Sequence, residues 1–290
     1  MSVINIERQP RLTVYGAIVQ AAKLSGAPMV YVEQTPLNEK LNVFPNEPVD
    51  LTTPPNIEYF GIGWGSTYSR PNADNIDEIV NYVHDPLDAN LFHLLPMVIR
   101  DIGDDDLTPE RRAKYAMRAT FEVDGVTKVG YFLKQVDRSQ TLITADMVVP
   151  AENVGGSDTI TPITGDSRYL NPTPTKLTDA TQRKDGAYVK VRAPIGMVFD
   201  AWEMNELINA KQIMTGSDQL EVTEIGLFSA VKKSKTVADG NNNITYTEAM
   251  KAQLNLVSPL RFVANDRVGE TTTLLQDLGI NNPTNFALPF

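Results

Sequence analysis

The chain has 290 residues, of which 42% are hydrophobic and 21% are charged, and it contains no cysteine. This composition is that of an ordinary globular protein with one large domain or two small ones. The lack of cysteine excludes disulfides, thiolate metal sites and a cysteine nucleophile. The formal net charge of −10 would repel nucleic acid, so direct nucleic-acid binding is disfavoured as the main role.

The first ten residues lack the basic start and the continuous apolar run of a signal peptide. Nowhere do about 18 apolar residues follow one another, which is the length that a membrane-spanning helix needs. We therefore expect a protein that neither spans a membrane nor is exported by the signal-peptide route. The lack of cysteine is consistent with assembly in a reducing cytoplasm.

The first predicted element is a helix within residues 11–26, where Tyr15, Ile18 and Ala22 recur at helical spacing and Gly26 supplies a stop. A short strand is expected to follow it at residues 29–32.

The next stretch, from Pro36 to Pro55, is rich in proline. Each proline removes a backbone donor and fixes φ, so we expect an extended arm or a long loop there rather than a helix or a central strand. Residues 56–64 combine β-forming side chains with flanking proline and glycine, and this pattern predicts a strand.

The end of that strand is rich in glycine, with Gly61, Gly63 and Gly65 around Trp64. A phosphate-binding loop would need a third glycine at fixed spacing or a Gly-Lys-Ser/Thr sequence, and neither is present. We therefore interpret the glycines as a tight strand exit with close backbone approach. Apolar residues at helical spacing predict a short amphipathic helix at residues 75–84.

The strongest acidic cluster is Asp104, Asp105 and Asp106, which could hold a hard cation. Its spacing is not that of an EF-hand loop. A turn that ends in a helix cap is the simpler interpretation, with Thr108 as N-cap and Pro109 at the first helical position. Whether the three aspartates bind a cation is left open.

The clearest hairpin signal is Asp124-Gly125, which joins two β-rich runs at residues 117–123 and 126–133. Only two histidines are present, His84 and His93, and no third metal ligand is indicated near them.

The composition shifts at residues 150–186 to glycine, serine, threonine, aspartate and proline. This stretch is too poor in apolar residues to form a core of its own, so we expect an insertion, an arm that reaches a neighbouring subunit, or a surface loop. Beyond it, alternation predicts a strand at residues 186–193, and a helix is expected near residues 201–211.

The C-terminal part predicts several strands, with an exposed turn that includes residues 232–235 and 239–243. The tail, residues 269–290, ends in an apolar segment that contains Phe286 and Phe290. Such a segment is expected to dock on its own domain or on a partner.

Residues 221–230, Glu-Val-Thr-Glu-Ile-Gly-Leu-Phe-Ser-Ala, predict a buried strand that carries a carboxylate, Glu224, and a glycine, Gly226. Glycine packs poorly in a sheet interior, so we interpret Gly226 as a place where the backbone of a neighbouring element approaches closely. A buried unpaired carboxylate would be costly, so Glu224 is expected to be hydrogen-bonded or ion-paired. Phe228 belongs to the same expected core.

The segment Thr223-Glu224-Ile225-Gly226-Leu227-Phe228-Ser229-Ala230 resembles the Glu-Ile-Gly-Leu-Phe strand of tail-fibre and tail-collar attachment domains of tailed bacteriophages. In that pattern a glycine-rich strand end precedes a helix, and residues 59–65 followed by residues 75–84 look similar. Residues 113–118 and 130–134 resemble sequences of myophage virion proteins. The resemblance covers about a third of the chain. The proline-rich arm, the 150–186 insertion and the tail depart from the fibre-attachment pattern and favour a neck, collar or baseplate component.

The resemblance implies a structural protein, not an enzyme, of the virion of a tailed phage, assembled in the host cytoplasm by contacts with other virion proteins and with copies of itself. Gly61, Gly63, Trp64, Glu224, Gly226, Phe228, Phe286 and Phe290 are the expected structural or interface residues. No cofactor and no membrane are expected.

Two alternatives stay open. One is a metal-assisted hydrolase that uses Asp104, Asp105, Asp106 and His93. The other is a carbohydrate-binding module, for which Trp64, Tyr68 and Tyr82 would have to form an exposed aromatic cluster.

The expected fold is α+β, mainly antiparallel β-sheet with peripheral helices and extended arms. Its expected parts are residues 1–149 with the proline-rich arm and the hairpin, the insertion or arm at 150–186, residues 187–268 of the same β domain, and the docking tail at 269–290.

Overall fold

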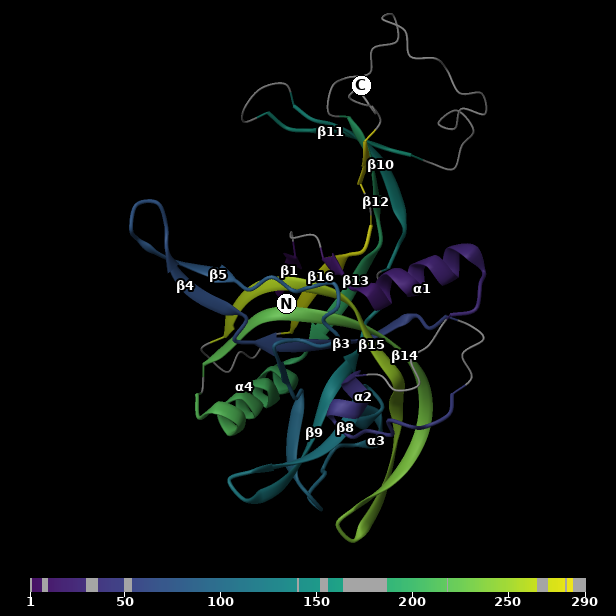
Figure 1. Ribbon diagram of the computed structural model, residues 1–290, viewed down its shortest axis with the longest axis vertical. Helices are drawn as coiled ribbons and strands as arrows, with labels where there is room; N and C mark the ends of the chain where they lie inside the picture. Colours follow the sequence, from purple (N-terminus) through teal and green to yellow (C-terminus); the bar gives the residue numbers. More distant parts are fainter. Residues whose placement is uncertain are drawn as a thin grey trace, which may run out of the picture. The chain divides into compact units, whose positions relative to one another are not determined.

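The computed structural model describes residues 2–6, 10–29, 36–49, 54–139, 141–151, 156–163, 187–217, 219–264, 271–279 and 281–283. The fold is α+β and mainly antiparallel β-sheet, as the sequence predicts (Figure 1). The chain divides into two compact units, one formed by residues 1–136 and 197–274 and the other by residues 137–196 and 275–290. Each unit is therefore assembled from two separate parts of the sequence.

The helices of the described residues are α1 (Val14–Ser25), α2 (Pro36–Lys40), α3 (Pro109–Arg112) and α4 (Ala201–Thr215). The strands of the N-terminal half are β1 (Ser2–Ile6), β2 (Arg11–Leu12), β3 (Ile57–Trp64), β4 (Thr67–Pro71), β5 (Asp77–Asn81), β6 (His93–Leu95), β7 (Val98–Asp101), β8 (Tyr115–Val123) and β9 (Val126–Gln135). The strands that follow are β10 (Thr144–Val149), β11 (Thr159–Pro162), β12 (Tyr188–Arg192), β13 (Pro194–Phe199), β14 (Leu220–Asp239), β15 (Asn242–Ala264), β16 (Thr272–Asp277) and β17 (Asn281–Pro283).

The first unit is organised around an eight-stranded sheet in the order β2-β15-β14-β3-β9-β7, with β6 also paired to β3 and β8 to β9. Strands β14 and β15 are unusually long and form one antiparallel ribbon closed at Asp239↔Asn242 (Figure 1). The turn between them contains Gly240 at a φ of 57°. Strand β14 lies between β15 and β3, so the segment Glu221–Ala230 is in the interior of the sheet.

Two predicted helix boundaries are confirmed by their caps. The Thr13 side chain accepts a hydrogen bond from the Gly16 amide at the start of α1, and Gly26 ends that helix in the left-handed region. At α3, Thr108 is the N-cap and Pro109 is the first helical residue.

The predicted helix at residues 201–211 is confirmed as α4, which begins with a reciprocal capping box between Asp200 and Glu203. The predicted Asp124-Gly125 hairpin is also confirmed, because β8 and β9 pair up to Val123↔Val126. Local turn and cap chemistry was thus sufficient to place these elements.

The helix expected at residues 75–84 is wrong, because β5 pairs with β4 there from Thr67↔Asn81 to Pro71↔Asp77. The Asn72 side chain accepts from the Asp74 and Ile76 amides, and Asn75 has a φ of 61°. These contacts close a tight turn, and the β-branched residues that follow it suit a strand as well as a helical stripe.

The prediction that residues 36–55 form an extended arm or a long loop is wrong in part. Pro36 starts the short helix α2, a position that needs no backbone donor. Leu37 and Val43 are buried in the core of the first unit, so the described residues 36–49 belong to the body of that unit. The exposed turn expected at residues 232–235 and 239–243 is wrong in its first part, since β14 continues to Asp239, and is confirmed in its second part, where the chain turns between Asp239 and Asn242.

The second unit contains the four-stranded sheet β11-β10-β12-β17, with Met147↔Thr161 and Met147↔Val189 among its registers. Strand β11 lies inside the predicted 150–186 insertion, of which the remaining residues lie mostly outside the described ones. A further sheet has the order β1-β16-β13. The short strand expected at residues 29–32 also falls largely outside the described residues.

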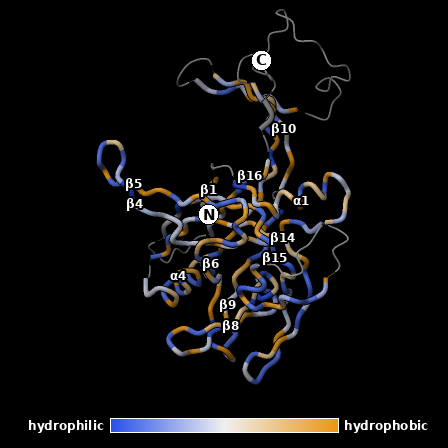
Figure 2. The backbone as a smooth tube through the Cα atoms, in the orientation of Figure 1, coloured by the Kyte–Doolittle hydropathy of each residue, from blue (hydrophilic) through white to orange (hydrophobic). Residues whose placement is uncertain are grey.

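The hydrophobic core of the first unit packs large side chains of β3, β8, β9, β14 and β15 together, including Tyr59, Met117, Leu133, Phe228 and Leu254. Apolar residues also occur along part of the β4–β5 hairpin (Figure 2), where Ile76 and Ile79 are exposed. None of the described helices is long and apolar enough to cross a membrane.

Candidate functional site

Strands β3 and β14 bring six of the eight predicted site residues together. Their register pairs Glu224 with Gly63 and Gly226 with Gly61. A Cβ atom on Gly63 would lie 2.5 Å from Oε1 of Glu224, closer than any side chain could tolerate. Gly63 therefore makes room for the Glu224 carboxylate, which is 1% exposed.

Gly61 and Gly226 make room for side chains of neighbouring strands and loops. A Cβ on Gly226 would lie 2.8 Å from Leu254, 2.8 Å from the Phe228 ring and 3.0 Å from Leu91. A Cβ on Gly61 would meet the Leu94 side chain at 2.8 Å. The close approach expected from the sequence is therefore made by side chains and not by a backbone.

The Glu224 carboxylate binds two donors. Its Oε1 accepts a hydrogen bond from the Phe92 amide at 2.6 Å, and its Oε2 lies 2.5 Å from Nε2 of His84. Nδ1 of His84 lies 3.0 Å from Oδ2 of Asp88, which also accepts from the Asp85 amide. Glu224, His84 and Asp88 thus form a carboxylate–imidazole–carboxylate chain.

Both ring nitrogens of His84 face carboxylate oxygens, so only the imidazolium, which has an N–H on each nitrogen, can satisfy both contacts. Burial acts to lower the pKa of His84, but the hydrogen bond and charge of Glu224, with a further contribution from Asp88, outweigh it and raise the pKa above its usual 6.5. The chain therefore keeps a buried cation between two anions.

A row of aromatic side chains begins beside this chain. The ring centroids of Tyr68 and Tyr82 are 4.6 Å apart, and those of Tyr82 and Phe92 are 5.3 Å apart. Phe92 in turn contacts the His84 ring edge to face, with centroids 4.9 Å apart. Tyr82 is 47% exposed and Phe92 is 38% exposed, so this row presents aromatic surface to solvent.

Trp64 lies at the end of β3, and its ring contacts His93 and Lys211. Its ring stacks on His93 with centroids 4.7 Å apart, and Nζ of Lys211 lies 3.1 Å from the Trp64 ring centroid. These contacts make Trp64 a packing residue that joins β3, β6 and α4.

A cavity of about 240 Å³ opens beside the His84–Glu224 pair and Tyr82. Its wall also contains residues of β2, β5 and β15 and of the chain after β3: Arg11, Ser66, Glu78, Ile79, Val80, Asn81, Val83, Val257 and Pro259. We call this space the Tyr82 cavity. It combines charged groups of both signs with hydroxyl, amide and apolar side chains.

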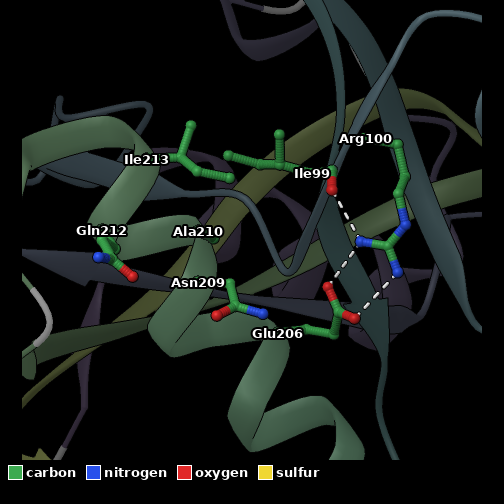
Figure 3. A pocket seen from close by; sticks show the side chains of 7 residues that line it. All are labelled: Ile99, Arg100, Glu206, Asn209, Ala210, Gln212 and Ile213. Atoms are coloured by element: carbon green, nitrogen blue, oxygen red, sulfur yellow. Dashed lines mark hydrogen bonds and ion pairs between the residues drawn. The ribbon is translucent and has the colours of Figure 1, made fainter.

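A second cavity, of about 230 Å³, lies between β7 and α4 (Figure 3). The Arg100 guanidinium forms a bidentate pair with Glu206 at its side, with distances of 2.7 and 2.9 Å. The Arg100–Glu206 pair joins the helix to the sheet, and Asn209 and Gln212 complete the polar part of the wall.

Two of the three aspartates of the acidic cluster contact arginines. Asp105 is buried and contacts Arg112 and Arg118 at 3.3 and 3.9 Å, while Asp106 pairs with Arg100 at 2.6 Å. His93 is not among these contacts, since its ring stacks on Trp64. Within the described residues no group of three or more histidine or acidic side chains could hold a metal ion.

Sequence reasoning identified the β3 and β14 residues but missed the partners of Glu224. The sequence favours a packed or surface position for His84 over a zinc site or a Ser-His-Asp arrangement, and Asp88 and Phe92 carry no motif. The signal that could have found them is the requirement that a buried carboxylate be paired, which directs attention to the only two histidines. Phe286 and Phe290 lie outside the described residues.

A mainly antiparallel β protein with a buried carboxylate–imidazole–carboxylate chain is thus the class that fold and site define. The chain belongs to a family of unknown function, DUF7208, whose profile matches residues 3–287. Neither the curated proteins nor the solved structures contain a match to it.

Proposed function

We propose that the chain is a structural protein of a tailed-phage particle, in the neck, collar or baseplate, and that it assembles through contacts with copies of itself and with other virion proteins. The observation that carries the proposal is the phage-like segment Thr223–Ala230. It lies in the interior of the large sheet and pairs with the glycine-rich strand β3, the other segment of the resemblance. The helix that the pattern places after β3 is replaced by the β4–β5 hairpin.

Exposed apolar side chains of the β4–β5 hairpin and the residues after it support assembly. Ile76 is 63% exposed, Ile79 is 53% exposed and Val83 is 67% exposed. A two-stranded hairpin is marginally stable by itself in water, and exposed apolar groups of this kind favour contact with a partner. This hairpin is our first choice for a subunit contact.

Mass spectrometry and imaging of purified particles of the phage that encodes the chain test the proposal. We expect the protein in particles at a stoichiometry that matches one symmetric ring or layer, and its absence from purified particles would refute the virion assignment.

Sedimentation of the purified chain tests the self-contact separately. We expect Ile79→Asp to shift the chain towards smaller species, because a charge would be buried in the contact. Leu24→Asp is the matched control, since Leu24 is 90% exposed on α1, outside the hairpin. Equal sedimentation of all three proteins would remove the hairpin from the proposal.

The two alternatives fare differently. The hydrolase would need Asp104, Asp105 and Asp106 near His93, but Asp105 and Asp106 are paired with arginines. The hypothesis of a carbohydrate-binding module requires exposed aromatic residues in one place. The row of Tyr68, Tyr82 and Phe92 favours this hypothesis. Trp64, which that hypothesis also requires in the exposed cluster, packs instead against His93 and Lys211.

A further inference from the structure

We propose that strand β5 pairs edge to edge with β5 of a second copy of the chain, antiparallel and across a two-fold axis at Ile79. The inference rests on the proposed subunit contact at the β4–β5 hairpin, and it names the partner and the geometry of that contact. Three features of the hairpin lead to it: the direction of its backbone groups, the difference between its two edges, and the charges at its two ends.

The hydrogen bonds of the hairpin show which of its backbone groups point away from it. The Asn72 amide donates to the Ile76 carbonyl at 2.9 Å, and the Tyr82 amide donates to the Ser66 carbonyl at 2.7 Å. Hydrogen-bonded and non-hydrogen-bonded residue pairs alternate along an antiparallel register, and the backbone groups of the non-hydrogen-bonded pairs point to the outer edges. In this hairpin the outward-pointing pairs are Thr67↔Asn81, Ser69↔Ile79 and Pro71↔Asp77.

The two outer edges differ in what they can bind. On the β4 edge, Pro71 has no N–H, and proline on an edge strand hinders pairing with a further strand. On the β5 edge, Asp77 and Ile79 each present an N–H and a C=O, and within the described residues no further strand pairs with the hairpin. Such an edge is a template for one more strand, so we place the contact on β5 and not on β4.

The strand that best completes this edge is a second β5. Ile79 is 53% exposed and lies in the middle of the strand. A two-fold axis at Ile79 puts its side chain opposite its own copy, and its amide and carbonyl groups then bond to those of the partner strand. An axis at Asp77 or at Glu78 would instead put two carboxylates directly opposite one another, which is destabilising in a sheet.

The charges at the two ends of the hairpin favour the same arrangement. Asp74 and Asp77, near the turn, and Arg11, near the base, are exposed, and none of the three forms an ion pair with another residue that the structure describes. Arg11 lies near the base because it shares the wall of the Tyr82 cavity with Asn81 and Val83. Antiparallel pairing brings the turn of one hairpin to the base of the other, so each acidic turn lies near the arginine of the other copy.

Disulfide trapping in the full chain tests the geometry, because the chain has no cysteine of its own. Directly opposite residues of a hydrogen-bonded antiparallel pair have Cα atoms about 5.5 Å apart, which is within the range of a disulfide. We expect Ile79→Cys to form a covalent dimer under mild oxidation. Ser69→Cys is the matched control, since Ser69 is exposed and lies opposite Ile79 on the other edge of the hairpin, and it should remain a monomer on a non-reducing gel.

Charge exchange tests the direction of the pairing by sedimentation equilibrium. Arg11→Asp and Asp77→Arg should each raise the dissociation constant of the dimer about tenfold, because like charges then meet at the contact. The two substitutions together should restore most of the affinity, since opposite charges face one another again.

The proposal is overturned by a chain that sediments as a monomer at every concentration, by an Ile79→Cys chain that does not cross-link, by equal cross-linking of Ser69→Cys, or by charge exchange without rescue. If Ile79→Asp still shifts the chain towards smaller species while Ile79→Cys fails to cross-link, the hairpin remains a subunit contact and only the pairing of β5 is refuted. The virion assignment is read from purified particles, so none of these results changes it.

Discussion

At the residue scale, the chain stabilises a buried carboxylate with a buried cation instead of excluding both from its core. Glu224 is 1% exposed and His84 is 9% exposed, and their atoms lie 2.5 Å apart. Removing one member of such a pair leaves the other charged and without its partner in a low-dielectric interior, which costs more than the pair itself contributes. The stability of this region should therefore depend on the protonation of His84.

The first prediction concerns pH. The folded-state pKa of His84 is raised above its unfolded value of about 6.5, so the stabilisation is fully present below pH 6.5 and is lost as the pH rises through the folded pKa. We expect the free energy of unfolding to fall above about pH 6.5, by up to about 1.5 to 3 kcal/mol, the contribution of a hydrogen bond to a charged group. Urea denaturation at a series of pH values measures it.

The control for this prediction is His84→Gln, which keeps a polar side chain of similar length but cannot titrate. The exposed His93 is present in both proteins and so contributes equally to both profiles. If the two proteins lose stability in parallel as the pH rises, His84 is not the group responsible.

The second prediction concerns the space under Gly63. Gly63→Ala would place a Cβ 2.5 Å from Oε1 and 2.6 Å from Cγ of Glu224, so the carboxylate must move from its donors. We expect a loss of about 1 to 3 kcal/mol in the free energy of unfolding, as for other overpacked cores. The same substitution in a Glu224→Ala background should cost less, and denaturant unfolding of all four proteins gives this coupling. Additive effects would show that the backbone of β3, and not Glu224, requires the glycine.

At the scale of elements, α2 shows how a short helix is fixed by one polar side chain. Asn38 on α2 is 1% exposed; its Nδ2 donates to the carbonyls of Val43 and Ala249, and its Oδ1 accepts from the Ala252 amide. Lys251 lies between the last two residues with a φ of 51°, in the left-handed region. Asn38 therefore satisfies backbone groups of β15 where the strand is irregular.

The third prediction follows from these contacts. Asn38→Leu keeps the volume of the side chain but leaves buried backbone groups of β15 without their partner, so we expect a loss of about 1 to 3 kcal/mol in the free energy of unfolding. Glu39→Gln, on the same helix, is the matched control and should change stability by less than about 0.5 kcal/mol, as at other surface positions. Equal stabilities of the two variants would contradict this role of Asn38.

The elements that could be predicted from the sequence are those whose ends carry their own chemistry, such as the Gly26 stop, the Thr108 cap and the Asp124-Gly125 turn. The β4–β5 hairpin and α2 could not, because long-range contacts decide them. Residues 75–84 fit a helical stripe, and only the pairing with β4 selects the strand. The proline-rich stretch has the composition of an arm, and only the contacts between Asn38 and β15 show that it belongs to the body of the first unit.

In the candidate site, too, some residues carry a local signal in the sequence and others are brought in only by long-range contacts. Gly63 on strand β3, and Glu224 and Gly226 on strand β14, could be singled out because each is unusual in a sheet interior. His84, Asp88 and Phe92 approach β14 only in the folded chain, 132 to 140 residues away for Phe92 and His84. No local pattern marks such a contact.

At the scale of the whole molecule, the two units differ in how much apolar surface their described residues bury. The first unit buries Phe60, Tyr131 and Phe228 completely within its large sheet. In the second unit, strands β10 and β12 are mostly half-buried, β11 is exposed, and Val148 is the one buried residue of these three strands. Burial of apolar area is the main favourable contribution to folding, so the second unit should be the less stable.

The last prediction is therefore that thermal unfolding occurs in two calorimetric transitions, the first from the second unit. Val148→Ala should lower only the first transition, and Ile62→Ala, in β3, should lower only the second, because each removes buried side-chain volume from one unit. Hydrogen exchange assigns the transitions: amides of β10 and β12 should exchange faster than those of β3 and β14. A single transition lowered by both substitutions would mean that the two units unfold as one cooperative structure, and the β10–β12 sheet would then derive its stability from the rest of the chain.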